Sequence, residues 1–406
     1  MNNISKSVPS PASPVLSPPA PSRSLPEPDS SGAVRLWRRL PDPATAVGLF
    51  LAARLIGVAA VTVAAVAAQK RPLGLLSRSW DSVWYLGLAH HGYGHTYYRF
   101  GHILSDLAFF PLYPGLIRAT TAVSPLEPGK AALLLSWTAA AVAAWGIYAI
   151  GARLHGRAVA IALVLLWGLL PHSVVLSMAY TEPVFTAFAA WSLYAVLTRR
   201  WLWAGSLALL AGLSRPSGFA VAAAVLAAAA VEVWRARGRV SPRLWAGAAL
   251  APLGWTAYVL WVGQRTGDLL GGYFAVQRGW GSRLGLGALR FSKHLLLQPD
   301  QFVFTMSLVL TGAGLLLYVL LLVDRAPLPL VAFTSVLVLV ALGNSAYFEC
   351  KPRFLLPAFP LLLPLAQALV RTARARPMHA AVVACALAGL SVVYGAYLVV
   401  LARLPV

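Results

Sequence analysis

The sequence predicts an all-α polytopic membrane protein with about eleven transmembrane helices. Three observations lead to this prediction. Of the 406 residues, 59% are hydrophobic, only 11% are charged, and the mean hydropathy is +0.71. A soluble domain carries roughly 25% charged residues. The charged residues of this chain are too few to cover a water-soluble particle of its size, so its outer surface must contact lipid.

The basic excess fits contact with a membrane. Lys and Arg number 33 against 12 Asp and Glu, which gives a net charge of +21. The basic residues stand in short runs between apolar stretches, as expected for cytoplasmic loops that face anionic lipid headgroups. We therefore expect membrane lipids and no nucleic acid among the partners. The two cysteines, Cys350 and Cys385, indicate neither a disulfide scaffold nor a metal site.

Residues 1–43 differ in kind from the rest of the chain. They are rich in Pro and Ser, and we predict a disordered tail without the apolar core of a signal peptide. Arg35, Arg38 and Arg39 stand before the first apolar run and place the N-terminus on the cytoplasmic side. Residues 44–406 form the predicted transmembrane domain.

Stretches of about 20 apolar residues can cross the hydrocarbon core of a bilayer. Several of the predicted spans are short, and two of them can tilt or break at Pro216. The predicted spans lie near 45–68, 130–152, 157–173, 181–198, 202–214, 217–233, 244–263, 302–323, 327–343, 354–370 and 379–402.

The segment 107–123 decides the orientation of everything that follows it. Its two prolines and Arg118 argue against a full crossing. With this segment at the interface, the short cytoplasmic links hold twelve basic residues and the opposite short loops hold three. A crossing would reverse this ratio, so we predict an interfacial helical element. The long loops 69–129 and 264–301 then lie outside.

This topology places most of the acids on the outer side, so any carboxylate chemistry belongs to the outer face. The outer acids are Asp81, Asp106, Glu127, Glu182, Asp268, Asp300 and Glu349.

Asp81 is the acid that the sequence favours as a catalytic base. It stands in SRSWDSVWYLGLAHHGYG directly after the first span, flanked by Trp80, Trp84 and Tyr85. Aromatic rings favour the headgroup zone, and they also pack against pyranose rings. We interpret Asp81 as a general base aimed into a sugar site. The alternative is an aromatic belt at the membrane surface with one solvated acid.

Two further acids border apolar segments. Asp106 opens SDLAFFPLYP, whose prolines and aromatic rings predict a rigid interfacial element; the alternative is a helix N-cap. Glu182 lies in SMAYTEPVF at the mouth of a span, where an acid is also favoured by the helix dipole alone. Both residues remain candidates for substrate binding.

The cations near the outer face are candidates for holding a phosphate. Arg215 in GLSRPSGFA lies in a short turn between two apolar runs. A charge so close to the membrane interior usually faces a cavity or a partner. Lys351 and Arg353 in NSAYFECKPRFLLPAFP can hold a phosphate diester, or they can simply anchor a helix end. Arg54 within the first span either pairs with an acid or snorkels.

The chain lacks the usual motifs for soluble cosubstrates. It has no DxD pair, no GxxxxGK[ST] loop, no HExxH pair and no GxSxG elbow. We therefore expect neither a nucleotide-sugar donor nor ATP, and we predict no metal site and no cofactor.

Five segments, in the same order, resemble the bacterial relatives of the PIG-V mannosyltransferases, which add the second mannose in GPI-anchor assembly. The resemblance runs from about residue 45 to 370. The segments are WDSVWYLGLAHHGYG, AFFPLYPGLIR, SMAYTEPVF, GLSRPSGFA and RFLLPAFPLLLP.

The resemblance implies a GT-C bundle, a class of membrane glycosyltransferase that takes a sugar from a polyprenyl-phosphate carrier and transfers it with inversion. Asp81 matches the first-loop acid, and Tyr180 and Glu182 stand in the YTE motif. Arg215 matches the SRPSG motif and Arg353 the late RxLLPxFP motif.

The expected function is therefore transfer of a hexose, mannose by the resemblance, to a hydroxyl of a lipid, glycan or protein acceptor. The expected location is the cell membrane, with the active site on the outer face. The alternative is a polytopic transporter or lipid flippase without transferase activity. A transporter would predict paired inverted repeats, and the sequence contains none that we can detect.

Overall fold

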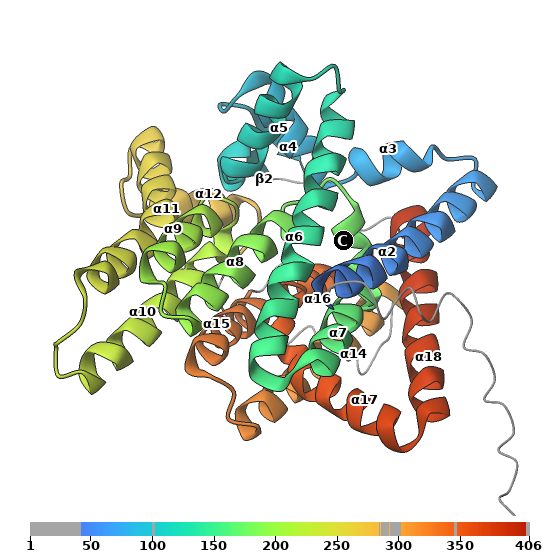
Figure 1. Cartoon of the computed structure of the whole chain (residues 1–406). Coiled ribbons are helices and arrows are strands. Elements are labelled where there is room, and N and C mark those ends of the chain that lie inside the picture. The colour runs from blue at the N-terminus through green and yellow to red at the C-terminus, as the bar shows by residue number, and fades with distance from the viewer. Residues whose placement is uncertain are drawn as a thin grey trace, which may run out of the picture. The chain divides into compact units, whose positions relative to one another are not determined.

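In the computed structural model, the described residues are 42–99, 102–283, 285, 292, 302–344 and 347–402. The predicted tail lies outside this part except for its last two residues, as does most of 284–301. Most of the described residues are helical (Figure 1). The prediction of an all-α polytopic architecture is thereby confirmed.

Six helices of the described part are long and apolar enough to cross a membrane. Each has about 20 residues or more once its adjoining turn is included, and therefore reaches about 30 Å. They are α2 (Asp42–Ala67), α6 (Pro128–His155), α10 (Phe219–Arg235) with the turn η3 (Pro216–Gly218), α11 (Pro242–Thr266), α14 (Phe302–Val323) and α18 (Pro377–Ala396) with the π-helical turn η6 (Tyr397–Leu401).

Two further apolar segments are sharply bent. In the first, α7 (Arg157–Gly168) meets the 3-10 turn η2 (Pro171–Ser177) at 83°. In the second, η4 (Phe348–Cys350) and α16 (Lys351–Leu355) meet η5 (Phe359–Leu362) and α17 (Leu363–Ala375) at 77°. Prolines at both bends explain the breaks, because proline removes a backbone donor and clashes with the preceding turn.

The remaining predicted spans coincide with three shorter apolar helices. These are α8 (Glu182–Leu197), α9 (Trp201–Gly212) and α15 (Leu328–Gly343). Every predicted span thus corresponds to a helix or to a bent pair. By length and composition, six helices, or up to eight spans with the bent pairs, can cross, so the full number of eleven stays a prediction.

Trp167 joins the two bent segments. Its ring stacks on Phe50 of α2 at 5.0 Å, and its indole Nε1 donates to the carbonyl of Leu356 at 3.0 Å. Ser173 of η2 donates to the Trp167 carbonyl at 2.7 Å. The end of α7 is therefore tied both to η2 and to the break that follows α16.

Helices α9 and α11 touch backbone to backbone. A methyl group on Gly205 of α9 would lie 2.1 Å from the Gly247 carbonyl oxygen of α11. Small residues permit such close approach between helices in a membrane. This contact matters for the site because α9 leads directly to Arg215.

The first long loop is helical, as predicted, and it also contains a hairpin that we did not predict. The loop holds α3 (Pro72–Ser77), α4 (Asp81–His91), the antiparallel pair β1 (Thr96–Arg99) and β2 (His102–Ser105), η1 (Asp106–Ala108) and α5 (Leu112–Val123).

Helix α5 has one buried face and one exposed face. Tyr113 and Ile117 are buried, whereas Arg118 is exposed. The Tyr113 hydroxyl donates to the carbonyl of Ala132 in α6 at 2.9 Å. The amphipathic pattern agrees with the interfacial position predicted for 107–123, and a helix of 12 residues covers only about 18 Å.

Candidate active site

Four charged side chains from distant parts of the chain form one cluster of ion pairs. Arg353 of α16 donates through Nη2 to Oδ2 of Asp81 at 2.5 Å. It also donates through Nε to Oε1 of Glu182, and Arg215 pairs with that same oxygen. We call these four residues the charged cluster. The sequence prediction that these residues share one face agrees with their meeting here.

The members of the charged cluster differ in exposure. The side chain of Glu182 is 0% exposed, whereas that of Asp81 is 26% exposed. Arg215 and Arg353 are nearly buried, at 8% and 5%. The two acids and two arginines compensate each other, as buried charges require. Asp81 is therefore the carboxylate that a substrate can reach, and Glu182 is the internal counterion of the arginines.

Both acids stand at helix starts. Asp81 is the first residue of α4 and Glu182 the first residue of α8, where the helix dipole stabilises negative charge. Pro183 lies in the first turn of α8, where proline is tolerated because that amide has no partner within the helix. Trp80, before Asp81, has φ 50° and ψ −115°, a conformation that a residue other than glycine rarely adopts. Such strain is common at functional sites.

The ring of Tyr180 packs against the guanidinium group of Arg353. The guanidinium carbon of Arg353 lies 4.4 Å from the centroid of the Tyr180 ring, which is a cation–π contact. The carbonyl of Tyr180 accepts from Ser136 of α6 at 3.0 Å. Ser136 in turn bonds the Tyr113 hydroxyl at 2.7 Å. The segment before Glu182 is therefore fixed to α5 and α6.

Tyr85 lies one helical turn after Asp81. Its hydroxyl is 3.2 Å from Oγ1 of Thr181, and its ring packs edge-on against Tyr113. Burial raises the pKa of the Tyr85 hydroxyl well above its usual value, and the charge of Asp81 raises it further. Tyr85 is therefore a neutral hydrogen-bonding group beside the charged cluster.

Trp84 belongs to a packed group of aromatic rings. It stacks on Phe109 at 5.4 Å and meets Trp280 edge-on at 4.9 Å. The Trp280 indole donates to the Ser105 carbonyl at 2.9 Å, which attaches α12 (Gly272–Gly279) to the first loop. Sequence reasoning did not single out Trp280. The direct role that these contacts support for Trp84 is to hold the first loop and α12 together, and sugar contact stays a prediction.

The side chain of Asp106 bonds to backbone groups of the first loop. Its Oδ2 accepts from the amides of Gly94 and His95, each at 2.9 Å. Within the described ranges, no ion pair joins it to the arginines of the charged cluster. These contacts shape the turn before the hairpin, and substrate binding by Asp106 stays a prediction.

Lys351 points to a helix end. Its ammonium donates to the carbonyl of Asn344 at 2.8 Å and to that of Ala341, at the end of α15. Arg353, two residues later, points into the charged cluster instead. The arrangement favours the anchoring alternative for Lys351 and the site role for Arg353.

Two further polar residues, Arg54 and His172, are buried. Arg54 donates to Ser391 of α18 at 3.3 Å, and it has no acidic partner in the part of the chain that the structure describes. The hydroxyl of Ser391 donates to the Leu170 carbonyl at 2.9 Å, just before η2. His172 of η2 is 2% exposed, and sequence reasoning missed it. The available signal was a histidine inside the apolar run LLPHSVV.

The described residues contain no group of three or more His, Cys, Asp or Glu side chains that could hold a metal ion. The charged cluster brings only two carboxylates together, and each is already bonded to an arginine. Operation without a metal stays a prediction.

No protein-family model matches the sequence, and no curated protein matches it. The solved structures do contain matches. The oligosaccharyltransferase of Archaeoglobus fulgidus in its apo form matches with a TM-score of 0.52 at 14% identity. The alignment covers 89% of this chain and 57% of that one.

The chain shares the GT-C fold of that structure. The fold that the resemblance implied is thereby confirmed. A second structure of the oligosaccharyltransferase from the same organism, tethered to an acceptor peptide, matches at 12% identity over 89% of this chain and 56% of that one. Its TM-score is 0.49, so the apo structure carries the fold assignment. The chain spans little more than half the length of these relatives.

Proposed function

We propose that the protein is a membrane glycosyltransferase that moves a hexose from a polyprenyl-phosphate carrier to a hydroxyl acceptor. The observation that carries the proposal is the charged cluster. It offers one accessible carboxylate, that of Asp81, which is bonded to Arg353. The buried carboxylate of Glu182 holds Arg353 in place. The PIG-V resemblance supports mannose as the sugar, and the acceptor is a lipid, glycan or protein hydroxyl.

In the proposed reaction, the oxygen of the acceptor hydroxyl attacks the anomeric carbon. Asp81 accepts the proton of that hydroxyl. The bond between that carbon and the phosphate oxygen breaks, and the phosphate leaves with the electron pair. Attack from the side opposite the phosphate inverts the anomeric centre. Because a polyprenyl phosphate is a good leaving group, the scheme needs no general acid.

Arg353 stabilises the charge that develops on the departing phosphate. Without a donor, its Nη2 bonds to Asp81. The donor phosphate competes for this guanidinium and so releases one oxygen of Asp81 for the acceptor proton. Donor binding then prepares the base, because the same arginine serves both groups.

Glu182 and Arg215 have a supporting role in this scheme. Glu182 bonds both arginines while staying fully buried, so its carboxylate holds their orientation. Arg215 keeps the local charge balanced when Arg353 turns toward the phosphate. We place this chemistry on the outer face of the cell membrane, in line with the charge distribution of the short loops.

Transfer of label tests the proposal. The purified chain in lipid nanodiscs is given polyprenyl-phosphate mannose with labelled sugar, together with a membrane extract as acceptor. We expect labelled product and free polyprenyl phosphate. Parallel donors with glucose or galactose test the sugar. Movement of the donor across the bilayer of proteoliposomes that contain the chain, without any product, would instead support the flippase alternative and overturn the proposal.

The Asp81→Asn variant should transfer at least about 100-fold more slowly, because the amide cannot accept the proton. Asp268→Asn is the matched control, since Asp268 is an exposed outer acid that bonds only the nearby Gly271 amide among the contacts described. Full activity of Asp81→Asn would remove the proposed base.

A further inference from the structure

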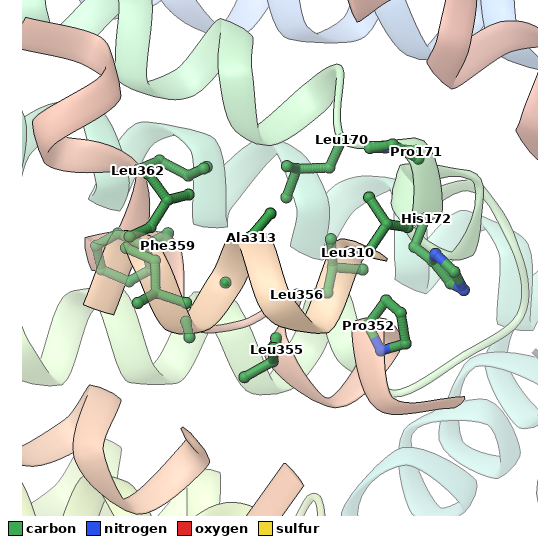
Figure 2. Close-up of a pocket in the computed structure, with 14 residues that line it drawn as sticks. Leu170, Pro171, His172, Leu310, Ala313, Pro352, Leu355, Leu356, Phe359 and Leu362 are labelled. Carbon is green, nitrogen blue, oxygen red and sulfur yellow. The ribbon is translucent and has the colours of Figure 1, made fainter. Parts of the chain in front are cut away.

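An apolar cavity of about 100 Å³ lies where the two bent segments meet (Figure 2). One wall is Leu170 to His172 at the first bend, and another is formed by residues between 352 and 362 at the second bend. Helix α14 closes the space with Leu310, Ala313 and Gly314. Almost every lining side chain is a hydrocarbon, so the cavity suits an apolar ligand.

Interrupting a helix inside a membrane costs free energy, because backbone groups lose their hydrogen-bond partners. Backbone groups that leave regular helices there are tolerated where they are buried in protein or line a cavity. Broken helices that meet near the membrane interior often form binding sites. Here both bent segments of the described part contribute to the wall of the same cavity. The arrangement points to a ligand site rather than to a packing defect.

The cavity and the charged cluster share one helical turn. Pro352 lines the cavity, and the next residue, Arg353, contacts Asp81 and Glu182. A ligand with an anionic group at Arg353 can therefore place the hydrocarbon attached to that group directly in the cavity. Ala313, which also lines the cavity, belongs to the exposed surface of α14, which gives a longer chain a way out to the lipid.

His172 provides the polar end of the cavity. Its side chain is 2% exposed, and neither ring nitrogen has a hydrogen-bond partner among the residues described. Figure 2 shows the ring at one end of the lining, beside Pro352. Buried polar groups nearly always have a partner, and a missing one needs an explanation. A phosphate oxygen of a ligand would supply it.

We propose that this cavity binds the phosphate-proximal isoprene unit of the carrier, with the His172 imidazole donating to the carrier phosphate. The proposal rests on the proposed function. A comparable cavity of about 150 Å³ in another protein binds benzene, so a cavity of this size admits one five-carbon unit and no more. The remainder of the chain leaves beside Ala313 and runs along the lipid-facing side of α14.

Photocrosslinking tests the placement without relying on transfer. A C55 polyprenyl phosphate with a diazirine on its first isoprene unit is bound to the full chain in nanodiscs and irradiated. We expect the label on 310–317 or 355–362, and competition by unlabelled C55 polyprenyl phosphate but not by phosphatidylglycerol. Label elsewhere, or equal competition by phosphatidylglycerol, would overturn the proposal.

Two glycines of α14 offer a matched pair of variants. Gly314→Leu fills the cavity, and its new Cβ meets only the flexible end of Leu355, at 2.9 Å. Gly312 does not line the cavity, and a Cβ there has nothing within 4 Å. We expect Gly314→Leu to raise the dissociation constant of C55 polyprenyl phosphate at least about tenfold, because apolar burial is lost. Gly312→Leu should leave it unchanged, and equal effects would contradict the site.

His172 is tested by a second pair. His172→Leu should weaken binding of C55 polyprenyl phosphate about tenfold, while His172→Gln, which keeps a donor, should weaken it less than about threefold. Binding of the uncharged C55 polyprenol should be the same in both variants. A His172→Leu variant that binds the phosphate normally would show that the imidazole only fills space, and would refute its assignment to the phosphate.

The outcomes separate the two proposals. Specific crosslinking without sugar transfer would leave the carrier site standing and refute the transferase. Transfer that Gly314→Leu leaves unaffected, together with crosslinks outside the cavity, would refute the site and leave the transferase standing.

Discussion

Arg353 connects the features on which the site depends. It bonds both acids of the charged cluster, lies over the Tyr180 ring, and follows the proline that lines the apolar cavity. A planar guanidinium can serve two carboxylates at once, whereas an ammonium is a point charge. Arginine is therefore required at this position by geometry as well as by charge.

The first residue-scale prediction concerns Arg353→Lys. This variant keeps the charge but cannot reproduce both contacts, so we expect transfer to fall about 100-fold or more. The matched control is Arg265→Lys, an arginine that contacts the Trp261 ring outside the charged cluster. Similar losses in both variants would indicate a general effect of arginine replacement.

The second residue-scale prediction separates Glu182 from Asp81. Replacing Glu182 by Gln leaves two buried arginines without their shared carboxylate, so we expect a loss of about 3 kcal/mol in stability. Thermal unfolding in detergent should show a clear decrease. Glu127→Gln, at an exposed acid, should unfold like the native chain because surface pairs contribute little. A Glu182→Gln protein of native stability would contradict the role of internal counterion.

At the scale of elements, breaks in the helices define the sites. Glu182 follows η2, Arg215 precedes η3, and Arg353 belongs to the short helix α16 between two 3-10 turns. At each break, a charged side chain stands next to an interrupted helix and can point toward the interior of the protein. The close contact of α9 with α11 fixes the helix that precedes Arg215.

The contact between α9 and α11 can be tested with a pair of glycine variants. Gly247→Ala should lower the unfolding temperature by several degrees, because a methyl group there would lie 2.2 Å from the Trp201 carbonyl oxygen. Gly48→Ala in α2, where nothing lies within 4 Å, should be neutral or slightly stabilising. If Gly247→Ala unfolds like native protein, the two backbones are not in contact.

At the scale of the whole molecule, the chain has the GT-C fold at 14% identity to a solved structure, and the alignment covers 57% of that structure's chain. Such a likeness concerns the arrangement of helices and leaves the chemistry to the individual residues. The charged cluster is consistent with the predicted sidedness, since its members come from segments that the topology places on one side.

The whole-molecule prediction concerns orientation. In a chain with Cys385→Ser, a cysteine at Asp268 should react with a membrane-impermeant maleimide on intact cells, and one at Arg237 should react only after lysis. Both positions are exposed, so accessibility within the fold does not limit the reaction. The opposite pattern would invert the topology and place the charged cluster on the cytoplasmic side.

Much of this architecture follows from the sequence alone. The scarcity of charge requires a lipid-facing protein, and the length of each apolar run marks a helix or a bent pair. Because the acids and inward-facing cations are so few, Asp81, Glu182, Arg215 and Arg353 could be chosen as candidates before their positions were known. Their local motifs sufficed for this choice, since each charge has a cost in an apolar context.

Only the tertiary structure decided which candidates meet. Asp81 and Arg353 are separated by 272 positions, and their contact depends on how the helices pack. Lys351 and Asp106 looked equivalent to Arg353 and Glu182, yet the folded chain directs them to backbone groups. The cavity beside His172 exists because the fold brings two proline-marked bends together. Local sequence specifies the elements of this protein, whereas long-range packing assembles its site.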